Sequence, residues 1–268
     1  MVPVTERAST SRRGPRRTRE AIRQLLIDAA VELVRRDGSI LIGGLPTLTQ
    51  VFDHLETSRG ITITYASVLG RVWASTEEFQ TEVVATLARD DSTTEATETI
   101  LKMIAVVESA DRSNLTGRWK AIQDLSRVIG ENSLNDLVNS ATWPTWIGIW
   151  STCAPTPNRP APDETVLDAL RESYENLAEN YTMVFEDIVD SLGFRAKAPF
   201  DIRHLAVAIT SLAEGCALRD GFDPRTMRGI KRPTGPGGKL EKWTLFGIGI
   251  ESLCHTMIEP IPRWKPPR

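Results

Sequence analysis

The sequence of 268 residues contains no long apolar run. No stretch approaches the roughly 18 uninterrupted apolar residues of a membrane-spanning helix. The arginine-rich start is followed by an amphipathic segment, whereas a secretory signal would continue with an apolar run. Cysteine is scarce: Cys153, Cys216 and Cys254 are odd in number, far apart and without CxxC spacing. We therefore expect a cytoplasmic protein with reduced thiols and no membrane partner.

Signatures of enzymes are also missing. The sequence has no Ser–His–Asp order, no P-loop and no dinucleotide-binding fingerprint. Glu251, His255 and Glu259 would share one helix face and could bind a metal. A solvated cluster, or one at the edge of a dimer, is the favoured interpretation because no other histidine or cysteine clearly joins them. We expect no enzyme, no cofactor and no metal.

Charge is distributed unevenly along the chain. The overall net charge is −3, but residues 1–23 contain seven arginines against Glu6 and Glu20, a net +5, which leaves −8 for the remainder. Residues 1–16 have no hydrophobic period and are predicted to form a flexible basic arm. Such an arm suggests a polyanionic partner. A solvated, disordered leader explains the same composition equally well.

Hydrophobic periodicity predicts an all-α fold. Helices are expected at 18–37, 47–57, 95–110, 115–129 and 133–150, and a capping box at Ser75 and Glu78 opens another to about residue 90. Residues 61–65 alternate like a strand. The proline-rich segment 154–162 is predicted to be a loop, and 221–241 a long mobile loop. No convincing sheet is expected.

The C-terminal part has the clearest pattern. In 163–192, 201–220 and 242–258, apolar residues alternate spacings of three and four, which gives each helix one straight seam. Small residues beside the last two seams would let helix backbones approach closely: Ala206, Ala208, Ala213, Gly215, Gly247 and Gly249.

Three stretches resemble the TetR family of bacterial transcription regulators. They are the opening helix from Thr18 to Gly38, the segment Val72–Phe79 with its aromatic and capped helix start, and, more weakly, 205–224. The resemblance implies an arm at 1–16, a three-helix helix-turn-helix DNA-binding domain at 17–76 and a ligand-binding and dimerisation domain at 77–268. Gly70 and Thr76 depart from the family, which usually has tyrosine and lysine there to contact DNA phosphates.

The resemblance assigns DNA contacts to a recognition helix at 64–71, despite its strand-like start, and to the arm. The residues are Arg12, Arg13, Arg16, Arg17, Arg19, Arg59, Thr62, Thr64, Tyr65, Ser67 and Arg71. Hydroxyl and guanidinium groups suit phosphates and base edges. Taken singly, each is ordinary polar surface. Trp73 and Phe79 are expected to be core.

The family's ligand cavity would be lined by one methionine and seven aromatic residues that together suit a small hydrophobic effector, although plain core is the favoured interpretation for any one of them. These are Met103, Trp119, Trp143, Trp146, Trp150, Tyr174, Tyr181 and Phe185. The seams at 201–220 and 242–258 would pair two copies through Ile202, Leu205, Ile209, Leu212, Cys216, Trp243, Phe246, Ile250, Leu253 and Met257.

The implied function is that of a homodimeric regulator, usually a repressor, that binds a palindromic double-stranded operator and releases it when effector binds. Two alternatives stay open. One is an all-helical small-molecule-binding protein or enzyme without DNA binding. The other is a regulator-like scaffold that has lost DNA binding through the changes at Gly70 and Thr76.

Overall fold

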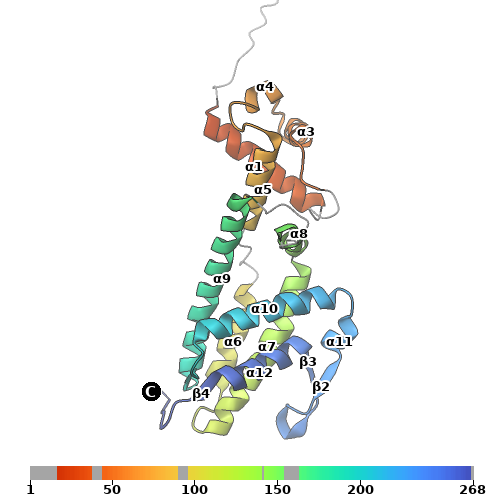
Figure 1. Cartoon of the computed structure of the whole chain (residues 1–268). Coiled ribbons are helices and arrows are strands. Elements are labelled where there is room, and N and C mark those ends of the chain that lie inside the picture. Colours follow the sequence, from red (N-terminus) through yellow and green to blue (C-terminus); the bar gives the residue numbers. More distant parts are fainter. Residues whose placement is uncertain (1–16, 38–43, 90–95, 141, 154–162, 267–268) are drawn as a thin grey trace, which may run out of the picture.

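The computed structural model describes residues 17–37, 44–89, 96–140, 142–153 and 163–266. Within them the fold is all-α, as predicted, with two short two-stranded ribbons. Figure 1 shows an elongated molecule with α1, α3 and α4 at one end and α9 running lengthwise below them. None of the described helices is both long and apolar enough to cross a bilayer.

The four described N-terminal helices include one, α5, that begins at the predicted cap Ser75. They are α1 (Arg19–Asp37), α3 (Leu48–Arg59), α4 (Tyr65–Val68) and α5 (Thr76–Ala88). Thr47 and Gln50 form a reciprocal capping box at the start of α3. At the start of α5, the Ser75 hydroxyl accepts from Glu78 N at 3.2 Å. The Glu78 carboxylate accepts from Ala74 N, one residue before the expected partner.

The remaining helices form the lower part of the molecule. They are α6 (Ala96–Ser109), α7 (Leu115–Asn139), α8 (Trp143–Cys153), α9 (Glu164–Ser191), α10 (Ile202–Asp220), α11 (Pro224–Arg228) and α12 (Leu245–Met257). The predicted break between 129 and 133 is wrong, because Ile129, Gly130 and Leu134 continue one buried helix face. Helix α7 instead ends at Asn139, and the backbone of the following Ser140 is extended. The proline-rich loop at 154–162 lies outside the described residues.

The prediction of a long loop at 221–241 is also wrong. The segment contains α11, β2 (Ile230–Arg232) and the 3₁₀ turn η2 (Pro236–Gly238), and it leads into β3 (Glu241–Trp243), which pairs antiparallel with β2. A second ribbon joins β1 (Phe194–Ala196) to β4 (Ile258–Pro260). Arg232 holds the first ribbon in place by an ion pair with Glu251 of α12.

Two hydrophobic clusters make up the core. The upper one joins α1, α3, α4 and α5 to Ile149 of α8 and to Val166, Ala169 and Leu170 of α9. The lower one joins α6, α7, α10 and α12 to the end of α9. The upper cluster therefore continues across residue 76, where the sequence predicted a domain boundary.

Glycines allow α7 and α12 to cross closely. A Cβ added at Gly130 would lie 2.4 Å from Gly247 Cα, and one added at Gly249 would lie 2.5 Å from Leu212 Cδ2. The predicted close approach of backbones is thus confirmed for Gly247, whose added Cβ would lie 2.8 Å from Ser126 O, whereas Gly249 makes room for the Leu212 side chain. Gly215 differs, because nothing lies within 4 Å of an added Cβ there.

Candidate functional site

The outer end of the molecule consists of α3, a connector and α4 (Figure 1). Gly60 ends α3 in the left-handed conformation, with φ of 64°. In the connector, Ile61 and Ile63 pack on the upper core while Thr62 and Thr64 are exposed. This alternation produced the strand-like pattern in the sequence. It results from a connector that lies along the core, and no strand forms there.

The second helix of this unit is shorter than predicted. We expected it at 64–71, but α4 spans Tyr65–Val68. Val68 is fully buried and anchors it. The chain then turns at Gly70, which has φ of 75° and donates a backbone hydrogen bond to Trp73 O at 2.8 Å. A side chain at this φ would be strained, which gives a physical reason for glycine where the resembling family has tyrosine.

Two of the predicted contact residues on this surface are without a side-chain partner among the described residues. Thr62 and Arg71 are exposed and make no side-chain hydrogen bond or ion pair there. Thr64 is exposed and Ser67 half-buried, and Ser67 Oγ accepts from Thr64 N at 3.3 Å and donates to Thr64 O at 2.6 Å. Tyr65 is 44% exposed, and its hydroxyl shares a 2.6 Å hydrogen bond with Thr49 of α3. Together they form a hydroxyl-rich surface supported by α3.

The predicted arginine contacts have different surroundings. Arg12, Arg13 and Arg16 lie outside the described residues. Arg17 is exposed, whereas Arg19 Nη2 donates to the backbone oxygen of Val72 at 3.1 Å. Arg59, a predicted phosphate contact, pairs with Glu32 of α1. Arg19 therefore supports the turn after α4, and a phosphate at Arg59 would have to compete with Glu32.

Trp73 connects the turn after α4 to α5. It is 2% exposed and packs edge-on against the fully buried Phe79 at 4.9 Å, so the expectation that both residues are core is confirmed. Its Nε1 donates to Glu82 Oε2 at 2.7 Å, and Arg23 of α1 donates to the same oxygen at 2.9 Å. Glu82 thus ties α1, the turn and α5 together. Sequence reasoning missed it, because a single mid-helix glutamate is usually solvated.

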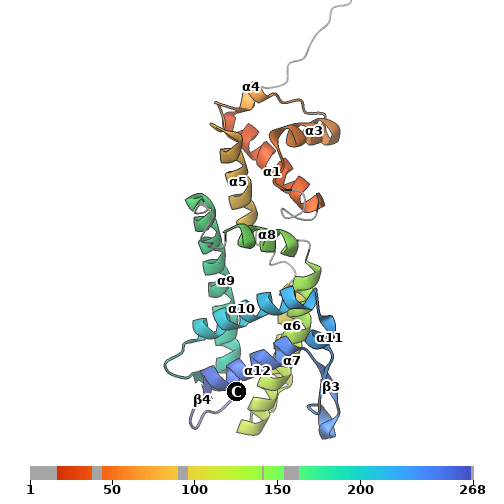
Figure 2. The same ribbon diagram turned by 45° about the vertical axis from the view of Figure 1, so that its right-hand side comes forward.

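Further contacts connect α5 to the lower part of the molecule. Arg89 forms a 2.8 Å ion pair with Glu172, and the Ser173 hydroxyl donates to the backbone oxygen of Ala88. Both partners belong to α9. Figure 2 shows α8 passing close to the lower end of α5. A displacement of α8 or α9 would therefore be transmitted to α5.

A polar and aromatic cluster lies where α8, α9 and α10 meet. The rings of Trp146 and Tyr174 are 5.5 Å apart, and the Tyr174 hydroxyl donates to Glu214 Oε2 at 3.4 Å. Burial raises the pKa of the Glu214 carboxyl despite hydrogen bonds from Tyr174 and Trp146. Burial and the nearby Glu214 charge also raise the pKa of Tyr174. Among the described residues, no lysine or arginine pairs with Glu214.

The other predicted ligand residues do not join this cluster. The ring of Trp119 stacks on that of His255 at 4.3 Å and lies 4.5 Å from the ring of Phe194. Met103, Trp143, Tyr181 and Phe185 belong to or pack against the lower core. Trp150, on α8 with Trp146, is 53% exposed. Two cavities found in the described part, of about 320 and 530 Å³, are lined by other residues, so the set does not line either of them.

The possible metal ligands also have separate roles. Glu251 accepts hydrogen bonds from Gln123 and Arg232, and Glu259 accepts from Arg195. His255 stacks on Trp119. Within the described residues, no group of three His, Cys, Asp or Glu side chains could hold a metal ion.

The predicted dimer contacts face the chain's own core. Eight of them are at most 9% exposed: Ile202, Leu205, Ile209, Cys216, Trp243, Phe246, Ile250 and Met257. Leu212 and Leu253 are half-buried and pack against the same core. A side chain buried within its own chain cannot be the contact surface for a second copy. The seams were identified correctly as apolar, but their assignment to a dimer interface is wrong.

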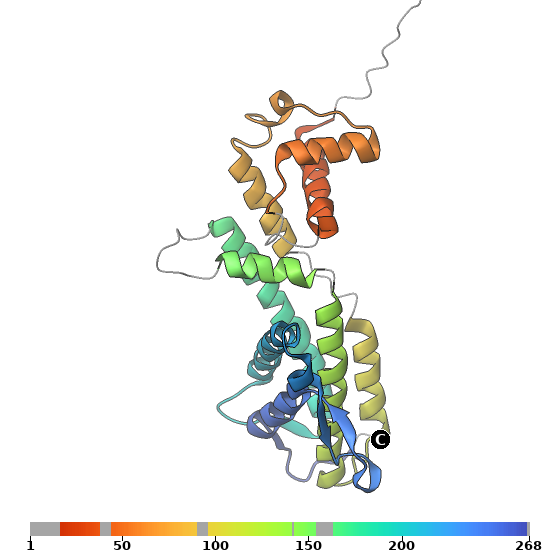
Figure 3. The same ribbon diagram turned by 90° about the vertical axis from the view of Figure 1, so that its right-hand side faces the viewer.

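The sides of α10 and α12 that do not face the chain's own core carry exposed apolar residues. On α10, Val207 is 44% and Leu218 47% exposed, and Phe222 just beyond its end is 81% exposed. Leu245, at the start of α12, is 43% exposed. The two helices are in contact and lie on the same face of the molecule (Figures 1 and 3).

Comparisons with known proteins give little further information. No protein-family model and no curated protein matches the sequence. Among solved structures, that of a candidate transcriptional regulator from Pseudomonas aeruginosa PAO1 is similar, with a TM-score of 0.40 and 15% sequence identity. The match covers 79% of this chain and 84% of that one. Values this low carry no information about what the present chain binds.

Proposed function

We propose that the chain is a homodimeric, ligand-responsive transcription regulator of the TetR type, with the DNA-contacting part at 17–76, the arm at 1–16 and the regulatory part at 77–268. The observation that carries the proposal is the unit α3–connector–α4 at the outer end. There two helices are joined by a glycine-containing turn, as in helix-turn-helix proteins, and the second exposes hydroxyl groups.

Contact with DNA in this proposal uses the exposed side chains around α4. Thr62 and Tyr65 supply hydroxyl groups for phosphates or base edges, and Arg71 supplies an exposed guanidinium. The basic arm adds phosphate contacts. Because each neutralised phosphate releases counterions, binding should weaken steeply with salt.

The dimer in this proposal uses the outer side of α10 and α12. Leu218 and Phe222 would contact the second copy, since exposed apolar patches of this kind mark interaction surfaces. A two-fold axis through this face would place both α4 helices on one side, and the two units would then read a palindromic operator. Such an interface leaves the apolar seams of α10 and α12 packed against the chain's own core.

The regulatory step is proposed at the junction of Trp146, Tyr174 and Glu214. A small, largely hydrophobic effector that separates α8 from α9 would disturb the contacts of α9 with the end of α5, including the ion pair of Arg89 with Glu172. Because Glu82 joins α5 to the turn after α4, the change would reach the DNA-contacting surface. The effector need only favour the DNA-incompetent arrangement by a few kcal/mol.

Selection of bound sequences from random duplex DNA tests the proposal. We expect an inverted repeat in the enriched pool, and loss of enrichment for Arg71→Ala. Lys239→Met is the matched control, because this exposed cation lies at the other end of the chain. Failure to enrich any sequence at low salt would refute DNA binding and would favour a small-molecule-binding protein.

A further inference from the structure

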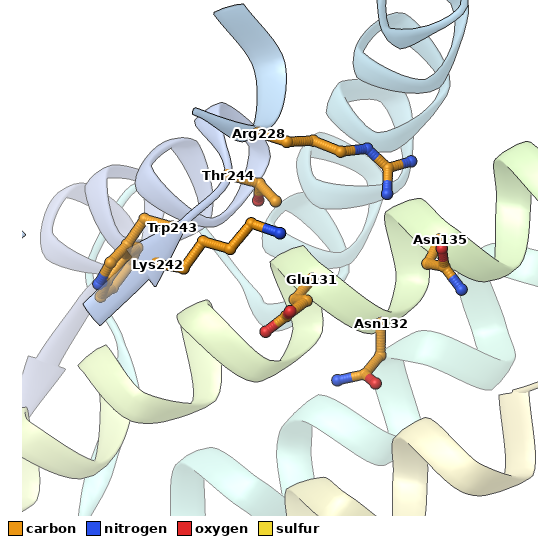
Figure 4. Close-up of a pocket in the computed structure, with 7 residues that line it drawn as sticks. All are labelled: Glu131, Asn132, Asn135, Arg228, Lys242, Trp243 and Thr244. Carbon is orange, nitrogen blue, oxygen red and sulfur yellow. The ribbon is translucent and has the colours of Figure 1, made fainter. Parts of the chain in front are cut away.

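A polar cavity of about 320 Å³ lies between α7 and the start of α12, and its lining includes none of Trp146, Tyr174 and Glu214 (Figure 4). Its lining residues are Glu131, Asn132, Asn135, Arg228, Lys242, Trp243 and Thr244. The volume lies in the range of small-molecule sites, but the lining is dominated by charged and amide groups. The proposed function gives this cavity no role.

Two cations point into the same space. Figure 4 shows the ammonium of Lys242 and the guanidinium of Arg228 directed toward the gap above α7. Arg228 is held in place by Asp220, which accepts from Nε at 2.7 Å and from Nη2 at 2.8 Å. This bidentate pair leaves Nη1 for another acceptor. Lys242 makes no hydrogen bond or ion pair within the described residues, so its charge is uncompensated by any direct partner.

The ribbon of β2 and β3 adds further positive charge. Lys231 of β2 lies directly opposite Lys242 of β3, and both are exposed. Residues directly opposite in an antiparallel pair share one face, so two like charges are held close together. The pair is unfavourable by itself and increases the attraction of this face for an anion.

The neutral groups are mostly donors. The Asn135 amide oxygen already accepts from Asn139, which leaves its NH₂ group to donate. The Thr244 oxygen accepts from Gly247 N as the cap of α12, and its hydroxyl hydrogen remains to be donated. Glu131 supplies one carboxylate on the same side of α7. A ligand that matches must therefore carry many acceptor oxygens, a negative charge and some hydroxyl donors.

We propose that this cavity binds a small polyhydroxy anion, a sugar acid or a sugar phosphate. The anionic group would lie between Lys242 and Arg228. Its hydroxyl oxygens would accept from Asn135 and Thr244, and a hydroxyl group would donate to Glu131. The site is independent of DNA binding and of the proposed effector.

Isothermal titration calorimetry of the full chain tests the proposal with gluconate, glucose 6-phosphate, glucose and inorganic phosphate. We expect one-to-one binding of gluconate or glucose 6-phosphate. Neutral glucose lacks the charge and inorganic phosphate lacks the hydroxyl array, so each should bind at least about tenfold more weakly. No binding of either charged sugar, or equally tight binding of phosphate alone, overturns the proposal.

Three variants locate the site. Lys242→Met should weaken binding at least about tenfold, whereas Lys239→Met, an exposed lysine outside the lining, should not change it. Glu131→Gln keeps an acceptor oxygen and removes a charge that repels the anion, so affinity should stay the same or rise. A large loss in this variant would indicate a cationic or zwitterionic ligand and would overturn the proposal. Unchanged melting temperatures verify that each variant is folded.

Discussion

Replacing Gly130 by alanine is expected to destabilise the crossing of α7 and α12. The new Cβ would lie 2.4 Å from Gly247 Cα, 2.5 Å from Gly247 N and 2.9 Å from Thr244 Oγ1. The two nearest atoms belong to backbone, so no change of rotamer can relieve the overlap. The two helices must separate, and their surrounding side chains must repack.

The magnitude follows from two opposing contributions. Alanine within a helix is more favourable than glycine by about 1 kcal/mol. Overpacking typically costs about 1–3 kcal/mol, and a rigid backbone neighbour places this case at the upper end. We therefore expect a net loss of about 2 kcal/mol in the free energy of unfolding. For a chain of this size, that corresponds to a fall of about 4–8 °C in the melting temperature.

Gly215→Ala is the matched control. Gly215 also lies within a helix, but an added Cβ there meets nothing of the same chain within 4 Å. Only the gain in helix propensity remains, so the variant should be stabilised by about 0.5–1 kcal/mol. Thermal and urea denaturation followed by circular dichroism would measure both changes. A Gly130→Ala protein that is as stable as the wild type would refute the close-contact argument.

Three further outcomes are expected. Arg71→Ala should reduce the slope of log K against log salt by about 0.9 in fluorescence anisotropy with the selected operator, and an unchanged slope would remove Arg71 from the phosphate contacts. Burial raises the pKa of Glu214 in the folded state above its ordinary value of 4.5, so the folded protein binds the proton more tightly and stability is lost as pH rises through the raised pKa. Glu214→Gln should therefore melt higher than the wild type at pH 8 and not at pH 4, and a difference independent of pH would contradict this. Phe222→Asp should shift the protein from dimer to monomer in sedimentation velocity without lowering the melting temperature of the monomer, because Phe222 is 81% exposed; a dimer that persists would exclude this contact.

Local signals in the sequence predicted most helices correctly. Thr47 and Ser75 mark real helix starts, and the seams of α9, α10 and α12 are apolar stripes as predicted. The short ribbons were missed because each strand spans three residues, too few to show an alternation. Hydrophobic periodicity identifies the apolar stripe of a helix but not the surface against which that stripe packs. The seam of α10 could face the same chain or a second copy, and only packing decides between them.

The candidate site was harder to predict because its contacts are distant in sequence. Glu82 meets Arg23 across 59 positions, and Glu214 meets Tyr174 across 40. Neither glutamate has a local pattern that distinguishes it from a solvated one. Trp73 was identified as core because its size and its place before a capped helix are local features.

The upper core has a consequence for any attempt to exchange DNA-reading ends between proteins. Because α5 packs both on α1 and on α9, a cut after Thr76 would leave apolar surface bare on both pieces. Ile149 and Leu170 would stay in the same piece as α5, whereas the side of α5 that packs on α1 would lose its cover. A chimaera with a foreign N-terminal segment would therefore need compensating changes on the side of α5 that faces α1 before it could fold.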